Sequence, residues 1–145
     1  MEFRRITAAD VDRVEAFAIE GMRPALYPMQ LSRDKVRSVI THFAHSQRDF
    51  QLAAFDGERM VGGIAALVSD LLWFERCEAH VVMLYATQAG VGRELVRRMF
   101  EWVRDDPRIR RVLWALEFDA PVSMMRMCTR MGFNSFNTMA GFYKV

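Results

Sequence analysis

The chain of 145 residues has few of the features that would direct its interpretation at once. Its two cysteines, Cys77 and Cys128, are too few for a disulfide framework, and their spacing is not that of a metal site. No apolar run reaches the roughly 20 residues that cross a bilayer, and residues 1–5 lack the apolar stretch of a signal peptide. These absences favour a cytoplasmic protein with no membrane association.

Charge of one sign is also scarce, since the formal net charge is only +2. That value gives no electrostatic case for nucleic acid as a partner. Lysine is rarer still: Lys35 and Lys144 are the two lysines, and the other cations are arginines. Two interpretations of the arginines stay open, a bias of genomic base composition or guanidinium groups that bind phosphate. Hydrophobic residues make up 52% of the chain, which predicts one folded domain over residues 1–145.

The most informative stretch is Thr-Gln-Ala-Gly-Val-Gly-Arg-Glu-Leu at residues 87–95. It follows an apolar run and opens an amphipathic one, which predicts a strand, a glycine turn and a helix. Gly90 and Gly92 let the backbone come close to a ligand, and a helix N-terminus attracts negative charge. The stretch therefore predicts an anion site, most often one for phosphate. A tight turn whose glycines serve packing alone is the alternative.

Other segments give one alternating order of elements. Asp56-Gly57 is a strong hairpin signal, Thr7 to Asp10 is typical of a capping box, and Gly132 is expected to end the last helix. Gly21 and Pro24 are expected to end the first helix. Strands are predicted at residues 2–6, 51–55, 60–69, 78–85, 112–118 and within 133–145. Periodicity alone indicates α/β or α+β.

Three of these motifs, taken in order, carry a family resemblance. Thr87-x-x-Gly90-x-Gly92 resembles the Gln/Arg-x-x-Gly-x-Gly/Ala loop of the GCN5-related N-acetyltransferase (GNAT) superfamily, with a departure at Thr87. Residues 56–64 are similar to the family's hairpin into its third strand, and Met131-Gly132-Phe133 to its helix-ending Gly-Phe. The resemblance covers essentially the whole chain. It implies a GNAT-like mixed, mostly antiparallel central sheet of 6–7 strands with about four helices on both faces.

The resemblance implies an acyl-CoA-dependent N-acetyltransferase. Such an enzyme moves an acetyl group from acetyl-CoA to a primary amine of a small molecule or protein by direct attack, with a general base and no covalent acyl-enzyme. We expect the cofactor in a notch between the fourth strand and the glycine loop. The residues expected to bind it are Val82, Met83, Leu84, Gln88, Ala89, Gly90, Val91, Gly92, Arg93 and Glu94.

Two candidates for the general base lie near the cofactor-binding end of the strand. Glu78 and His80 are two residues apart, so they are predicted to point the same way as Val82 and Leu84. Glu78 is slightly preferred; an edge-capping carboxylate and a half-buried histidine are the alternatives. For the general acid, many members of the family carry a tyrosine four residues before the Gly-Phe, and here Cys128 occupies that place. A thiol acid and a packed small hydrophobe both stay open.

The departures at Thr87 and Cys128 keep other functions open. One is a protein of the same fold with changed chemistry, for example the modification of nucleic acid. Another is a non-catalytic module that binds CoA or serves a structural role. Trp73-Phe74 is expected near a strand turn, exposed or at an interface, so a homodimer is a further hypothesis.

Overall fold

The computed structural model describes residues 1–22, 31–114 and 122–133. The elements in chain order are β1 (Glu2–Arg4), the short 3-10 helix η1 (Ala8–Asp10), α1 (Val11–Met22), α2 (Arg33–His45), β2 (Phe50–Asp56), β3 (Arg59–Asp70), β4 (Cys77–Ala86), α3 (Val91–Asp105), β5 (Ile109–Trp114) and α4 (Val122–Arg130). Among the described helices, none is both long and apolar enough to cross a membrane.

One sheet organises these elements, with the strand order β1-β2-β3-β4-β5. The first three pairings are antiparallel and β4–β5 is parallel, so the predicted mixed, mostly antiparallel sheet is confirmed. The described residues form five strands, which does not match the predicted six or seven. The further strands were expected within residues 133–145, and residues 134–145 lie outside the described part of the chain.

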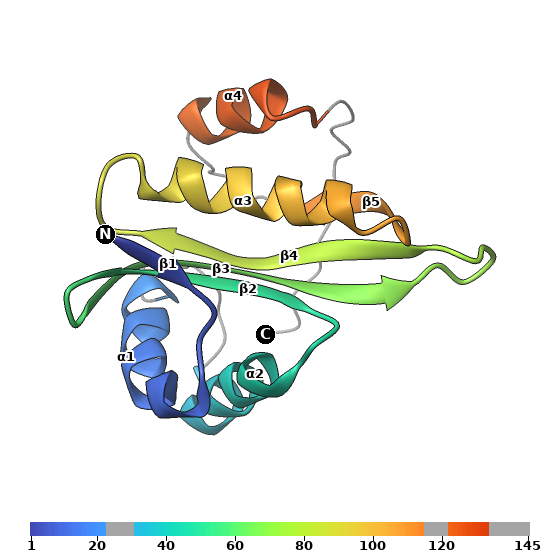
Figure 1. The fold of residues 1–145 in the computed structure, drawn as a ribbon. Coiled ribbons are helices and arrows are strands. Elements are labelled where there is room, and N and C mark those ends of the chain that lie inside the picture. The colour runs from blue at the N-terminus through green and yellow to red at the C-terminus, as the bar shows by residue number, and fades with distance from the viewer. Residues whose placement is uncertain (23–30, 115–121, 134–145) are drawn as a thin grey trace, which may run out of the picture.

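Helices cover both faces of the sheet, as the resemblance implies (Figure 1). On one face α3 packs through Leu95, Val96 and Met99 onto strand residues such as Val61, and we call this cluster the α3 core. On the other face α1 and α2 pack through residues such as Phe17 onto the opposite side of the same strands, and we call that cluster the α1/α2 core. Figure 1 shows α4 beyond α3, farther from the sheet.

The local signals of the sequence are found where they were predicted. Gly57 (φ 60°) forms the turn between β2 and β3, and Gly132 (φ 100°) follows the end of α4. The Asp10 carboxylate accepts from the Thr7 amide at 2.9 Å, which is the reverse bond of a capping box. The first helix, α1, passes through Gly21 to Met22, and Pro24 lies outside the described residues. A Cβ at residue 21 would come within 2.6 Å of the Tyr85 ring, so this glycine allows the close packing of α1 against β4.

Candidate active site

The central feature of β4 is a β-bulge. Met83 pairs with Ala65 and Val81 pairs with Ala66, so Val82 is an extra residue with no partner on β3. Before the bulge, Val81 packs into the α3 core; after it, Met83 packs into the α1/α2 core. The alternation of side chains therefore reverses at residue 82.

The bulge overturns one prediction about the candidate bases. By alternation with Val81, Glu78 and His80 project to the α1/α2 face of the sheet. Leu84 packs against the α3 core on the opposite face, so the prediction that it points the same way as Glu78 and His80 is wrong. The physical reason is that one inserted residue exchanges the faces of everything that follows it.

The second half of β4 has an open edge. Its parallel pairing with β5 ends at Val81↔Trp114. Residues 83–86 pair with β3 on one side, and on the other side no strand of the described residues reaches residues 82–86. Backbone amides and carbonyls along such an edge are available to an extended ligand.

This open edge leads directly into the glycine loop and α3. Gly90 has a left-handed backbone (φ 82°) and precedes the helix as its N-cap. The Glu94 amide donates to the Gly90 carbonyl at 3.1 Å, whereas the amides of Gly92 and Arg93 have no acceptor among the residues that the structure describes. Val91 is buried over Gly62, where a Cβ would come within 2.5 Å of the valine side chain, so the glycine in β3 lets the helix end sit close to the sheet.

The loop residues predicted to bind the cofactor differ in what they offer. Ala89, Gly90 and Arg93 are exposed. The side-chain nitrogen of Gln88, Nε2, lies 3.4 Å from a carboxylate oxygen of Asp56, the last residue of β2.

Glu94 fits an anion site poorly. Arg97 and Arg98 bind its carboxylate and lower its pKa to about 2, so the side chain is an ion-paired carboxylate on the helix surface. Its amide is already engaged by Gly90. The groups of this loop that could bind an anion are therefore the backbone amides of residues 92 and 93, which have no acceptor among the described residues.

Thr87, the departure from the family motif, has a local role. Its amide donates to the Val61 carbonyl at 2.9 Å, and its hydroxyl lies 3.3 Å from the same oxygen. The side chain thus joins the loop to β3. A glutamine or arginine at this position is not needed to hold the loop in place.

Glu78 and His80 form a hydrogen-bonded pair that a third residue orients. Glu78 Oε1 lies 2.7 Å from His80 Nε2. The other carboxylate oxygen accepts from Nε of Arg111, on β5, at 2.8 Å. Burial opposes ionisation of Glu78, but the hydrogen bonds from Arg111 and His80 outweigh it and lower the pKa of the carboxyl. Both carboxylate oxygens are thus engaged, while the second imidazole nitrogen has no partner among the described residues.

Sequence reasoning missed Arg111 as part of this site. The residue is 33 positions from Glu78 and reaches it only because β4 and β5 run side by side in parallel. The one available signal in the sequence was the pair Arg110-Arg111, immediately before the strand predicted at residues 112–118.

Half-exposed leucines flank His80 on the sheet surface. Leu67 pairs with His80 on one side and Leu113 pairs with it on the other. The two leucines are 37% and 36% exposed, so His80 has a partly exposed apolar neighbour on each adjacent strand.

Cys128 does not belong to this arrangement. It is 1% exposed, and burial raises the pKa of its thiol. Its helix, α4, lies beyond α3, on the side of the sheet opposite to that of Glu78 and His80 (Figure 1). The structure therefore supports packing as the role of Cys128.

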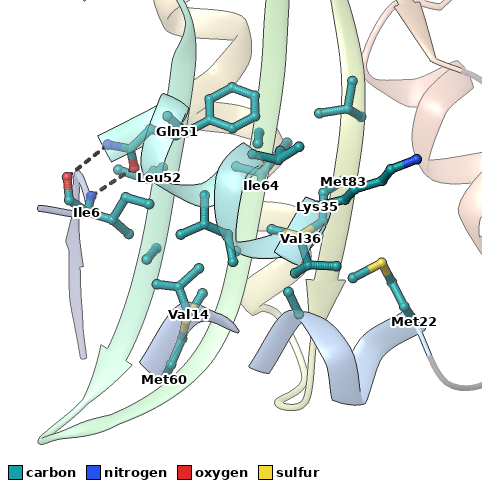
Figure 2. Close-up of a pocket in the computed structure, with 18 residues that line it drawn as sticks. Ile6, Val14, Met22, Lys35, Val36, Gln51, Leu52, Met60, Ile64 and Met83 are labelled. Atoms are coloured by element: carbon teal, nitrogen blue, oxygen red, sulfur yellow. Dashed lines mark hydrogen bonds between the residues drawn. The ribbon is translucent and has the colours of Figure 1, made fainter. Parts of the chain in front are cut away.

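A cavity of about 260 Å³ lies between the sheet and helices α1 and α2 (Figure 2). It extends to Val82 and Met83 at the bulge. Among the described residues, its lining is apolar apart from Gln51 and Lys35. The Gln51 amide group is hydrogen-bonded at both ends to the Ile6 backbone, at 2.8 and 3.1 Å. No sequence signal predicted this cavity.

Comparison with known proteins identifies the fold. No family model and no curated protein matches the chain by sequence. Among solved structures, "a possible acetyltransferase from Clostridium difficile 630" has a TM-score of 0.79 and 13% identity over 99% of this chain and 97% of its own. An aminoglycoside acetyltransferase from an uncultured soil metagenomic sample, in complex with sisomicin, has a TM-score of 0.71 and 11% identity over 99% and 95%. A transcriptional regulator from Bacillus halodurans C-125 has a TM-score of 0.76 and 14% identity over 99% of both chains.

These likenesses establish a shared fold, because the identities are low. The resemblance to the GNAT superfamily is thereby confirmed at the level of architecture: the chain has the fold of acetyltransferases.

Proposed function

We propose that the chain is an N-acetyltransferase that moves the acetyl group of acetyl-CoA to a primary amine. The observation that supports this most strongly is the continuity of the open β4 edge with the N-terminus of α3. An extended ligand that carries amides and ends in a pyrophosphate can pair with such an edge and place its phosphates at the helix end. Acetyl-CoA is a ligand of that kind.

The glycine loop meets a direct test of fit for an anionic ligand. A Cβ at Gly92 would make only an ordinary 3.7 Å contact with Ala86, and a Cβ at Gly90 would meet nothing within 4 Å. Packing within the described residues thus does not demand a glycine at position 92. The absence of a side chain there leaves open space beside the two free amides, which suits phosphate oxygens.

In the proposed reaction, two side chains and one backbone amide of β4 act on the reacting groups. When bound, acetyl-CoA supplies an activated acyl carbonyl. His80 takes the proton from the attacking amine, and Glu78 holds the imidazole and stabilises its positive charge. A backbone amide at the Val82 bulge donates to the carbonyl oxygen as negative charge develops on it. The new C–N bond replaces the C–S bond, and the departing thiolate takes a proton from solvent.

Calorimetry of CoA binding tests the proposal with two matched variants. Gly90→Asp and Gly90→Asn introduce side chains of nearly equal size, and both residues tolerate the left-handed backbone. Only aspartate adds a negative charge beside the phosphate position. We expect Gly90→Asp to bind CoA at least about 10-fold more weakly than Gly90→Asn.

Equal CoA affinity of Gly90→Asp and the wild type would place the binding site elsewhere. CoA binding without release of thiol in the presence of any amine would instead support the non-catalytic alternative. Thermal unfolding of both variants serves as the control for folding.

A further inference from the structure

We propose that the cavity beneath the β4 bulge binds the body of the acceptor, so that the substrate class is a primary amine carried on an apolar chain or aromatic ring. This inference rests on the proposed acetyltransferase function and names its acceptor. It concerns the face of the sheet covered by α1 and α2, not the edge at which CoA is proposed to bind.

The candidate base and the cavity lie on the same face of the sheet. His80 projects to the α1/α2 face, and the cavity beneath that face extends to Val82 and Met83, two and three residues farther along β4. An amine that gives its proton to His80 must approach from this face. The remainder of the acceptor then has the cavity beside it.

The lining selects an apolar group. Val14 and Val36 line it from the two helices, and Met60 and Met83 line it from the strands (Figure 2). Ala18 and Ile40 complete the helical side of the lining. The one neutral polar side chain of the described lining, that of Gln51, is already bonded to the Ile6 backbone. An apolar protein cavity of about 150 Å³ stays dry and binds benzene. The larger cavity here, of about 260 Å³, can therefore hold a ring with its linker.

Charge argues against an acceptor with several amines. The described lining contains no carboxylate, and its one charged residue is Lys35, whose ammonium group points away from the cavity in Figure 2. A second cation on the acceptor would be desolvated without a partner in the described lining. The soil aminoglycoside acetyltransferase, solved with sisomicin, shares the fold, but the lining of this cavity, as far as the structure describes it, has no acidic group for such a ligand.

The approach to the cavity is also apolar. Val39 on α2 and Val82 on β4, both in its lining, are 52% and 48% exposed. Leu67 and Leu113 continue an apolar surface around His80. Exposed apolar side chains gathered beside a concave site are typical of ligand-binding surfaces.

The test compares two amines and two leucine variants of α1. Phenethylamine and sisomicin are offered with acetyl-CoA, and thiol release is measured. Ala18→Leu fills the cavity, whereas Ala16→Leu makes the same change at an exposed position two residues away. We expect a kcat/KM for phenethylamine at least about 10-fold above that for sisomicin. Ala18→Leu should lower the phenethylamine value about 10-fold or more through KM, while Ala16→Leu should match the wild type.

Binding is measured separately from chemistry. Phenethylamine should raise the unfolding temperature of the wild type and of Ala16→Leu but not of Ala18→Leu, with equal CoA affinity for all three by calorimetry. Failure of the wild type to bind CoA would refute the proposed function. The thermal shifts with phenethylamine would then still test whether the cavity binds such an amine. Preference for sisomicin, or phenethylamine binding that Ala18→Leu does not weaken, would overturn the inference. So would an Ala18→Leu variant that loses only longer acyl-CoA donors, because the cavity would then hold the acyl group.

Discussion

The carboxylate of Glu78 and the imidazole of His80 are joined by a 2.7 Å hydrogen bond on the α1/α2 face of β4. Arg111 occupies the other oxygen of Glu78 and helps to lower the pKa of that carboxyl. A carboxylate held ionised by two partners is a poor proton acceptor but a good support for a neighbouring imidazole. The geometry therefore favours His80 as the base and Glu78 as the positioning residue, the reverse of the slight preference drawn from the sequence.

The first prediction separates these two roles. His80→Gln should lower kcat by ~10²–10⁴-fold at neutral pH, and the loss should shrink at high pH, where free amine is abundant. Glu78→Gln should cause a smaller loss, because the imidazole keeps a hydrogen-bond partner but loses the neighbouring negative charge that supports it when it takes up the proton. Steady-state kinetics across pH, with CoA affinity as the control, checks both variants. Full activity of His80→Gln at every pH would require another route for the proton.

The second prediction compares two glycines in helices. Gly92→Ala should stabilise the ligand-free protein by about 0.5–1 kcal/mol, since alanine is the better helix former and the added methyl group has room. It should also weaken CoA binding. Gly21→Ala should destabilise the protein by about 1–3 kcal/mol, because its Cβ would come within 2.6 Å of the Tyr85 ring. Chemical denaturation and calorimetry measure both effects; tighter CoA binding by Gly92→Ala would exclude this glycine from the binding site.

The third prediction concerns Cys128. Its thiol is buried across the sheet from His80, so Cys128→Ala should keep kcat within about twofold of the wild type. The substitution should cost about 1 kcal/mol of stability through the small cavity it leaves. A fall in kcat of tenfold or more, in a variant whose unfolding is otherwise normal, would support Cys128 as the general acid.

The fourth prediction is a pH dependence of stability. Arg4 binds both oxygens of Asp10 at 2.8 Å and holds the pKa of this carboxyl far below its usual range. A lowered pKa in the folded state stabilises the protein above the unfolded-state pKa, about 3.9, and that stabilisation is lost as the pH falls through the folded-state value. Asp10→Asn should therefore cost about 2 kcal/mol at pH 7. The difference in unfolding free energy between the wild type and Asp10→Asn should narrow below about pH 4. Denaturant titrations at several pH values measure this difference, and a difference that stays constant with pH would contradict the prediction.

Local sequence signals predicted much of the fold. Gly57, Gly90 and Gly132 each adopt a positive φ, which glycine accepts readily. The positions of these glycines in the sequence therefore marked the turns and helix ends. The bulge at Val82 left no such signal, because its residue type is ordinary for a strand. The faces of Glu78 and Leu84 could not be related without it.

Long-range contacts were beyond the reach of spacing arguments. Arg111 meets Glu78 through the parallel pairing of β4 with β5, and the cavity arises from how α1 and α2 rest on the sheet. Each depends on the packing of elements far apart in the chain. The family resemblance supplied the architecture but not these particulars.

The extra residue in β4 also constrains how the length of this strand can vary. Deleting Val82 would remove the bulge and leave His80 and Met83 two positions apart, on the same face as before and with the same pairing of Val81 and Met83 to β3. A further insertion between residues 80 and 83 would instead exchange the faces of the residues that follow it, unless the strand changed its pairing. Within residues 78–86 the loss of Val82 should therefore disturb the fold less than other single-residue insertions or deletions, and a library of length variants screened for folded protein would test this expectation.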